Sequence, residues 1–270
     1  MAAPLPPPRK RYGQHFLHDP AIIARILEAI DPRPGRRLVE IGPGRGALTA
    51  PLLNAAGELD VVEIDRDLAT LLPARLGATP PRLRVHCRDA LDFWLEELAP
   101  VPSGYDVVGN LPYNISTPLI FHLLQQASLI RTMVFMLQKE VADRICAPPG
   151  NKQYGRLSVM VQYHCLVERL FSIGPGAFTP PPKVESTVIR MTPRQHSAGE
   201  RAQDGKAFSI LVARAFSTRR KTLRNALRDF CNAEQIIGAG VDPGARAERL
   251  SVADFVRLSN TIAAGRCRVM

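Results

Sequence analysis

Five short apolar runs alternate with helical patterns over the first half of the chain, and this alternation limits the fold more than any other feature. The runs have strand length and cover Leu38–Ile41, Leu59–Ile64, Leu83–Cys87, Tyr105–Val108 and Met133–Leu137. Apolar residues recur at helical spacing between them, in 47–56, 68–76, 91–98 and 117–127. Strands joined by crossover helices pair in parallel, with helices on both faces of the sheet. The sequence therefore predicts an α/β fold.

The pattern changes near residue 195. Before it, we expect two further helices, at 140–146 and 157–163, and two late strands, at 167–173 and 184–191, that form an antiparallel edge. Residues 192–205 are polar and predict a linker, and the patterns beyond it are helical only, in 207–216, 220–230, 233–237 and 252–263. We therefore predict a flexible basic leader over 1–18, a Rossmann-like domain over 19–195 and a small all-helical domain over 206–270.

Positive charge is concentrated in the last part of the chain. The 270 residues carry a net charge of +10, and residues 196–270 alone hold 13 Lys and Arg against 7 Asp and Glu. Such an excess favours a polyanionic partner, because binding to phosphates releases counterions. A charged, solvated surface is the alternative, and we favour nucleic acid.

Composition argues against several other classes of protein. No run approaches the ~18 apolar residues of a membrane helix, and the proline-rich start lacks the apolar centre of a secretory signal. The five cysteines are odd in number and include no C-x-x-C pair, so we expect neither a disulfide framework nor a bound metal. A reduced, cytoplasmic protein is the expectation, working as a monomer.

A glycine-rich turn follows the first predicted strand and suits a nucleotide-like cofactor. Gly42, Gly44 and Gly46 allow close approach of the backbone, and the following helix offers free N–H groups. Glu63 ends the next strand, where a carboxylate accepts hydrogen bonds from both hydroxyls of a ribose. Asp89 follows the third strand and could accept a hydrogen bond from an adenine amino group.

The turn by itself leaves the cofactor open between NAD and S-adenosylmethionine. The spacing is not the G-x-G-x-x-G of most NAD sites, because Ala47 takes the position of the third glycine. Glu40 precedes the turn, where its carboxylate could orient a cation or a bound water at the amino-acid end of a cofactor. These features favour S-adenosylmethionine.

The fourth predicted strand runs into Asn110-Leu111-Pro112-Tyr113, which suits transfer of a methyl group to an exocyclic amine. Such an amine is a poor nucleophile, because its lone pair is delocalised into the ring. The side-chain oxygen of Asn110 and the carbonyl of Leu111 could accept its two N–H groups and localise that pair. Pro112 fixes φ and has no N–H, so it holds the turn open. Tyr113 could stack on the base, close to the developing positive charge.

Five segments together resemble the ribosomal RNA adenine dimethyltransferases, and the similarity runs from about residue 9 to residue 263. They are Gly13–Leu17 (GQHFL), Glu40–Gly46 (EIGPGRG), Asn110–Ser116 (NLPYNIS), Leu137–Val141 (LQKEV) and Phe178–Val184 (FTPPPKV). The bacterial small-subunit branch, which is linked to kasugamycin sensitivity, matches best. This resemblance implies a Rossmann-like S-adenosylmethionine-dependent methyltransferase domain followed by a small all-helical domain.

The resemblance also implies a reaction and a substrate. Members of this family transfer methyl groups from S-adenosylmethionine to N6 of two adjacent adenines in the 3′-terminal hairpin of 16S rRNA. They act during biogenesis of the small ribosomal subunit, so the implied partner is 16S rRNA within the immature subunit.

The resemblance also carries residue roles over to this chain. The cofactor contacts carry over to His15, Leu17, Gly42, Gly44, Glu63, Asp89, Ala90 and Asn110. Many relatives have Asn at the position of His15, so a contact of its backbone is what we expect there. Phe178 would stack on the target adenine opposite Tyr113, and Lys183 would meet phosphate. Separately from the resemblance, Arg219, Arg220, Lys221 and Arg224 share part of a predicted helix face in a region of net charge +6, which favours contact with RNA phosphates over a merely solvated face.

Three other functions compete with this one. The first is a methyltransferase of large-subunit rRNA that confers macrolide resistance, although the Pro180–Lys183 loop and the helical tail favour the small-subunit branch. The second is a ribosome-binding assembly factor whose chemistry is dispensable. The third is a NAD-dependent dehydrogenase.

Overall fold

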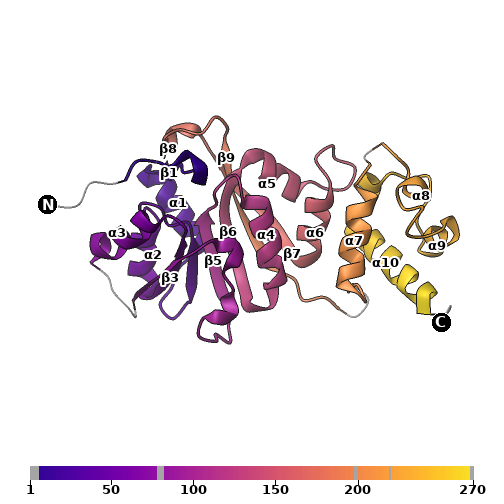
Figure 1. Cartoon of the computed structure of the whole chain (residues 1–270), viewed down its shortest axis with the longest axis horizontal. Helices are drawn as coiled ribbons and strands as arrows, with labels where there is room; N and C mark the ends of the chain where they lie inside the picture. Colours follow the sequence, from indigo (N-terminus) through magenta and orange to yellow (C-terminus); the bar gives the residue numbers. More distant parts are fainter. Residues whose placement is uncertain (1–5, 78–81, 198–199, 219, 268–270) are drawn as a thin grey trace. The chain divides into compact units, whose positions relative to one another are not determined.

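The computed structural model describes residues 6–77, 82–197, 200–218 and 220–267 (Figure 1). The chain forms two compact units, one of residues 1–142 with 166–193 and the other of 143–165 with 194–270. This division differs from the predicted boundary at 195, because residues 143–165 pack with the C-terminal helices. Tyr163, for example, lies with its ring 4.4 Å from that of Phe208.

The first unit is built on a seven-stranded sheet with the order β4-β3-β2-β5-β6-β9-β7 (Figure 1). The strands are β2 (Leu38–Ile41), β3 (Leu59–Glu63), β4 (Leu83–Cys87), β5 (Tyr105–Asn110), β6 (Ile130–Gln138), β7 (Cys165–Ile173) and β9 (Ser186–Pro193). The first five in the order run parallel, as predicted, and β9 is antiparallel to β6. The two late strands are neighbours, with β7 at the edge and β9 inside it.

Helix α1 precedes the first parallel strand, three further helices connect parallel strands, and side-chain caps fix where two of the four begin. The helices are α1 (Pro20–Ile30), α2 (Thr49–Ala56), α3 (Arg66–Leu76) and α4 (Ser116–Gln125). Asp19 accepts hydrogen bonds from the first N–H groups of α1, and Asp65 accepts one at the start of α3.

The predicted helix at 91–98 is wrong. Two 3₁₀ turns stand there instead, at Ala90–Asp92 and Leu95–Glu97. Phe93 is 3% exposed and Leu95 is 1% exposed, so the apolar side chains turn inward at alternate residues rather than along one helix face. Glu97 accepts the backbone N–H of Trp94 and closes the second turn locally.

The segment predicted as a flexible leader is part of the first unit. A 3₁₀ turn at Lys10–Tyr12 leads into β1 (Phe16–Leu17), which pairs antiparallel with β8 (Phe178–Thr179). Phe16 and Leu17 are buried, and Leu17 belongs to the main apolar core. Burial of such side chains stabilises a fold by ~1.5–3 kcal/mol each, which explains why this segment is fixed.

The second unit contains helices only among its described residues. They are α6 (Arg156–His164), α7 (Gly205–Ala215), α8 (Leu223–Ala226), α9 (Ala233–Gly238) and α10 (Val252–Cys267), and α5 (Lys139–Cys146) passes from the first unit into the second. The predicted helix at 220–230 is reduced to the single turn of α8. The backbone N–H groups of Leu223 and Arg224 donate to Ala245 and Pro243, so a neighbouring loop takes the place of a preceding helical turn.

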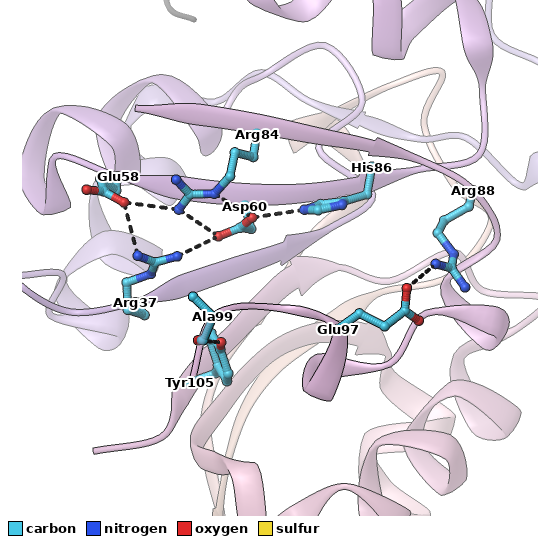
Figure 2. A network of polar contacts seen from close by, with 9 residues as sticks. All are labelled: Arg37, Glu58, Asp60, Arg84, His86, Arg88, Glu97, Ala99 and Tyr105. Carbon is cyan, nitrogen blue, oxygen red and sulfur yellow. Dashed lines mark hydrogen bonds and ion pairs between the residues drawn. The ribbon is translucent and has the colours of Figure 1, made fainter. Parts of the chain in front are cut away.

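A buried carboxylate on β3 is held by side chains of the neighbouring edge strand, β4 (Figure 2). Asp60 of β3 is 1% exposed and accepts hydrogen bonds from Arg84 Nε (2.9 Å) and from His86 Nε2 (2.9 Å). Glu58 accepts a hydrogen bond at 3.1 Å from both Arg37 and Arg84. Burial disfavours the charge on Asp60, but the bonds from His86 and Arg84 outweigh it and hold its pKa below the ordinary value. The stability that Asp60 contributes is therefore lost only as the pH falls through that lowered pKa.

No helix in the described part of the chain has the length and apolar content that crossing a membrane requires.

Candidate active site

A cavity of about 280 Å³ opens where β2, β3 and β5 end, at the carboxyl edge of the sheet. The strand order reverses direction between β2 and β5, which is where ligands bind in open α/β sheets. Four stretches of chain supply the wall: residues 11–17, the turn after β2, the end of β3 with Asp89, and residues 110–115. All of these belong to the first unit.

The glycine turn has the backbone conformation that only glycine adopts easily. Gly42, Gly44 and Gly46 have φ values of 67°, 55° and 83°. A Cβ on Gly42 would lie 3.6 Å from the backbone oxygen of Asn110 and 3.8 Å from the Pro112 ring. The turn and the Asn-Leu-Pro-Tyr segment, which are 68 residues apart in sequence, thus form adjoining walls of the cavity.

Glu63 lies beside the turn, where a ribose acceptor was predicted. Its two carboxylate oxygens accept hydrogen bonds from the backbone N–H of Gly44 (3.1 Å) and of Asp65 (2.9 Å). Burial raises the pKa of Glu63, and these two N–H bonds oppose the rise. The bonds fix the carboxylate at the cavity wall, and each oxygen keeps a further lone pair for a hydroxyl group.

Glu40 is a second buried acid of the cavity. It is 2% exposed, and its Oε2 atom has no hydrogen-bond partner among the described residues. Burial raises its pKa to about 8, and the neighbouring Glu63 adds to this rise. A buried carboxylate oxygen without a hydrogen-bond partner is costly, so a ligand that brings positive charge or donors would be stabilised here.

Asn110 ends β5 and presents its amide to the cavity. Its Nδ2 atom donates to the backbone oxygen of His15 at 2.9 Å. This bond leaves the side-chain oxygen as the free acceptor of the amide. The N–H of Leu111 is occupied by the carbonyl of Met136, at 3.1 Å, which fixes the peptide that follows Asn110.

Tyr113 is held from two sides. Its hydroxyl forms a 2.7 Å hydrogen bond with Ser186 Oγ, and its ring stacks on that of His15 at a centroid distance of 5.4 Å. His15 Nδ1 is in turn 2.7 Å from the backbone oxygen of Pro180. Burial raises the pKa of Tyr113, so the side chain offers a neutral aromatic ring at the cavity wall.

Most of the residues predicted for the site lie in the cavity wall. They are His15, Leu17, Gly42, Gly44, Glu63, Asp89, Asn110, Leu111, Pro112 and Tyr113. Ala90 and Lys183 are not among the wall residues. Ala90 is buried in the 3₁₀ turn that Asp89 caps, and Lys183 is exposed in the loop before β9.

The structure also corrects the placement of Phe178. This residue was expected to face the target base opposite Tyr113, but it is 2% exposed and packs in the main apolar core. Its backbone pairs with Leu17, and this pairing joins the FTPPPKV segment to the GQHFL segment. In this arrangement Phe178 supports the wall from behind instead of forming it.

The wall residues with no role assigned from sequence include Arg11, Tyr12, Gln14 and Arg45. The guanidinium of Arg45 lies 4.3 Å above the ring of Phe16, and that of Arg11 lies 4.6 Å above the ring of Tyr12. Gln14 lies in the GQHFL segment, so this segment was a sequence signal that could have identified it as a site residue. No sequence signal identified Arg11 and Tyr12, because both lie in the predicted flexible leader.

The predicted RNA-binding residues are exposed where the structure describes them. Arg220, Lys221 and Arg224 lie in or beside α8 of the second unit, and their side chains face solvent. Arg219 lies outside the described residues. No group of three or more His, Cys, Asp and Glu side chains in the described ranges is arranged to hold a metal ion.

Comparison with known proteins decides the family. The family model for ribosomal RNA adenine dimethylase matches residues 7–264. The chain belongs to the ribosomal RNA adenine dimethylase family. It is 54% identical to a protein named ribosomal RNA small subunit methyltransferase A from Pseudomonas savastanoi pv. phaseolicola, over 94% of each chain. Its counterpart of the same name in Pseudomonas aeruginosa is also 54% identical, over 94% of each chain.

Solved structures agree with this assignment. A dimethyladenosine transferase from Plasmodium falciparum superposes with a TM-score of 0.77 at 26% identity, covering 90% of this chain and 96% of that one. The 23S rRNA methyltransferase ErmE superposes with a TM-score of 0.67 at 27% identity, covering 92% and 99%. This adenine dimethylase is therefore a Rossmann-like methyltransferase that uses S-adenosylmethionine and acts on rRNA.

The acidic groups in the cavity wall match the positive charge and the hydrogen-bond donors of this cofactor. Glu40 and Glu63 are buried acids in the wall, and S-adenosylmethionine carries positive charge on its sulfur and its amino group. Gly42 and Gly44 of the glycine turn lie in the cavity wall, where a ligand can approach their backbone. When bound, the cofactor supplies a methyl group activated by the positively charged sulfur.

The close approach of β2 and β5 predicts the effect of Gly109→Ala. A Cβ at this position would lie 2.3 Å from the backbone oxygen of Ile41, so the two strands would have to separate. We expect a loss of about 1–3 kcal/mol in the free energy of unfolding and at least ~10-fold weaker binding of S-adenosylhomocysteine, measured by urea unfolding and by calorimetry. Gly176→Ala is the control, because nothing lies within 4 Å of its Cβ position. Equal affinities for Gly109→Ala and the parent would contradict the prediction.

The raised pKa of Glu40 predicts a pH dependence of the ligand-free protein. Between its ordinary value of 4.5 and about 8 the folded protein holds this proton more tightly than the unfolded chain does. The contribution of Glu40 to stability therefore falls as the pH rises through this window. Glu40→Gln should raise the Tm at pH 8 and flatten its decline between pH 5 and about 8 in calorimetric scans. Glu96→Gln, on the exposed surface, should follow the parent; parallel curves for all three proteins would refute the assignment.

Proposed function

We propose that this protein dimethylates N6 of two adjacent adenines in the 3′-terminal hairpin of 16S rRNA, within the immature small ribosomal subunit. The placement of the Asn110 amide beside the glycine turn is the observation that carries this proposal. The substrate is supported by the relatives, whose name specifies the small subunit. With such a substrate, we propose that the protein acts in the cytoplasm. We also propose that it acts as a monomer.

The cofactor contacts in this proposal follow the wall of the cavity. Glu63 accepts the ribose hydroxyls with the lone pairs that its two backbone bonds leave free. Asp89 accepts the adenine amino group, and Glu40 faces the cationic end. The backbone of His15 and Leu17 closes the wall on the opposite side.

The target amine is activated by two oxygen atoms. The side-chain oxygen of Asn110 accepts one N–H of N6, and the carbonyl of Leu111 accepts the other. The bond from Asn110 Nδ2 to His15 keeps the amide in the orientation that this step requires. Positioning and electrostatics then carry the catalysis, and no base has to remove a proton before attack. Tyr113 stacks on the adenine ring.

The base must leave its stack to reach this cavity, so the target lies in an irregular or single-stranded part of the RNA. Arg220, Lys221 and Arg224 are exposed and form no ion pair with any residue that the structure describes. We propose that they bind RNA phosphates and that the exposed Lys183 does the same near the cavity. Arg219 precedes Arg220 in the sequence, and we propose that it also binds RNA.

Mapping of the modified nucleotides tests the proposed reaction. The full chain should transfer label from S-adenosylmethionine to two adjacent adenines of unmethylated small subunits. Asn110→Ala should lower the rate at least ~10²-fold, because the amine loses an acceptor made for the transition state. Asn54→Ala, exposed on α2, should leave it unchanged.

The other outcomes of this experiment separate the alternatives. Label on large-subunit rRNA would favour the macrolide-resistance branch, which the fold similarity to ErmE keeps in view. Subunit maturation that survives in Asn110→Ala and fails only with loss of binding would favour the assembly factor. Methylation at the normal rate in Asn110→Ala would remove this residue from the mechanism.

The basic surface predicts a salt dependence. The double variant Lys221→Ala/Arg224→Ala should lower the slope of log affinity against log salt by about 2, because two phosphate contacts are lost. The control Arg33→Ala/Arg82→Ala removes two exposed charges that lie next to the amino ends of β2 and β4, away from the cavity. Filter binding to small subunits between 50 mM and 200 mM salt gives the slopes. Equal slopes for both double variants would exclude the surface around α8.

A further inference from the structure

Residues 9–15, here named the N-terminal strap, are tied to a carboxylate outside the cavity wall. Asp65 is 1% exposed and accepts hydrogen bonds from Arg9 Nη1 at 2.8 Å and from Gln14 Nε2 at 3.0 Å. The backbone N–H of Arg9 donates to Gln14 Oε1 at 2.7 Å. Arg9 also pairs with Asp67 in the first turn of α3. Arg9, Gln14 and Asp65 thus form a closed ring of hydrogen bonds.

This ring adjoins the predicted cofactor site through one peptide. The backbone N–H of Asp65 donates to Glu63 Oε1 at 2.9 Å, on the carboxylate assigned to the ribose. Asp65 therefore joins the end of β3, the start of α3 and the strap. If the strap moved away, the buried carboxylate of Asp65 would lose the hydrogen bonds from Arg9 and Gln14, which is costly.

The other end of the strap reaches the reaction side of the cavity. Gln14 is anchored to Asp65, and the next residue, His15, accepts the bond from Asn110 Nδ2 at 2.9 Å. Gly13 has a φ of 60°, and its Cβ position lies only 3.3 Å from Asn114 Oδ1. The strap therefore lies directly on the turn that carries the catalytic amide, and its anchor is one residue from the atom that orients this amide.

We propose that Gln14 and Arg9 are positioning residues that act through Asp65. They hold the strap so that it forms a wall of the cofactor cavity and places the His15 carbonyl where it orients the Asn110 amide. The kinetic part of this inference rests on the proposed function, whereas the parts on cofactor binding and strap order do not. Loss of the hydrogen bonds to Asp65 affects cofactor binding and the orientation of the Asn110 amide together, because residues 9–15 contact both sides of the cavity.

Gln14→Leu tests the anchor, because it keeps the approximate size of the side chain and removes its donor and acceptor. We expect ~10-fold or greater weakening of S-adenosylhomocysteine binding by calorimetry, as for loss of a hydrogen bond to a charged group. Hydrogen exchange of the backbone amides in residues 9–17 should become faster, while exchange in β5 and β6 stays as in the parent. At saturating S-adenosylmethionine, kcat should also fall, because the Asn110 amide loses its fixed partner.

Two further variants keep the test decisive. Arg9→Met removes the ion pair from a side chain that is 32% exposed, so the core stays intact, and it should give the same pattern in smaller measure. Gln125→Leu, exposed near the end of α4, is the matched control and should behave as the parent. A general structural role would lower the Tm and leave affinity and local exchange unchanged in the folded protein.

The outcomes distinguish this inference from the proposed function. Unchanged affinity and unchanged exchange in both Gln14→Leu and Arg9→Met would overturn the positioning role. A parent protein that methylates no rRNA would overturn the proposed function, while the binding and exchange results would still decide the role of the strap. If Gln14→Leu does not fold, Arg9→Met alone decides the question. Unchanged affinity and unchanged hydrogen exchange in Arg9→Met would then overturn the positioning role.

Discussion

The site depends on the close contact between β2 and β5 at one glycine. Gly109 faces the backbone of Ile41 so closely that a Cβ would stand 2.3 Å from the carbonyl oxygen. The next residue of each strand begins a functional segment, the glycine turn after Ile41 and the Asn-Leu-Pro-Tyr turn after Gly109. Because both segments start at this contact, the backbone, and not mobile side chains, sets the separation between the glycine turn and the Asn110 segment.

Electrostatics adds a second constraint to this geometry. Glu40 and Glu63 are buried in the cavity wall, and burial raises the pKa of both. The protein therefore keeps acidic groups in a place where their charge is costly until a cationic ligand arrives. Asp60, on β3 of the same sheet, shows the opposite arrangement, because hydrogen bonds from His86 and Arg84 hold its pKa low.

The N-terminal strap shows how distant segments of the sequence become one site. Its Gln14 binds Asp65, its His15 contacts Asn110 and Tyr113, and β1, which follows it directly, pairs with β8. A segment with few apolar residues of its own is thereby held on three sides by contacts with other parts of the first unit. Methyl transfer in this family requires the cofactor and the base to be placed together, and the strap contacts both walls of the cavity.

The sequence by itself determined the order of the parallel strands, the glycine turn and the residues of the Asn110 segment. These are local properties, because apolar periodicity and glycine conformation depend on neighbours a few residues away. Tertiary structure alone decided that residues 9–17 are ordered, that Phe178 packs in the core, and that 91–98 and 220–230 do not form helices. Each of these depends on partners far along the chain, such as Thr179 for Phe16 or Ala245 for Leu223, and no local pattern identifies such partners.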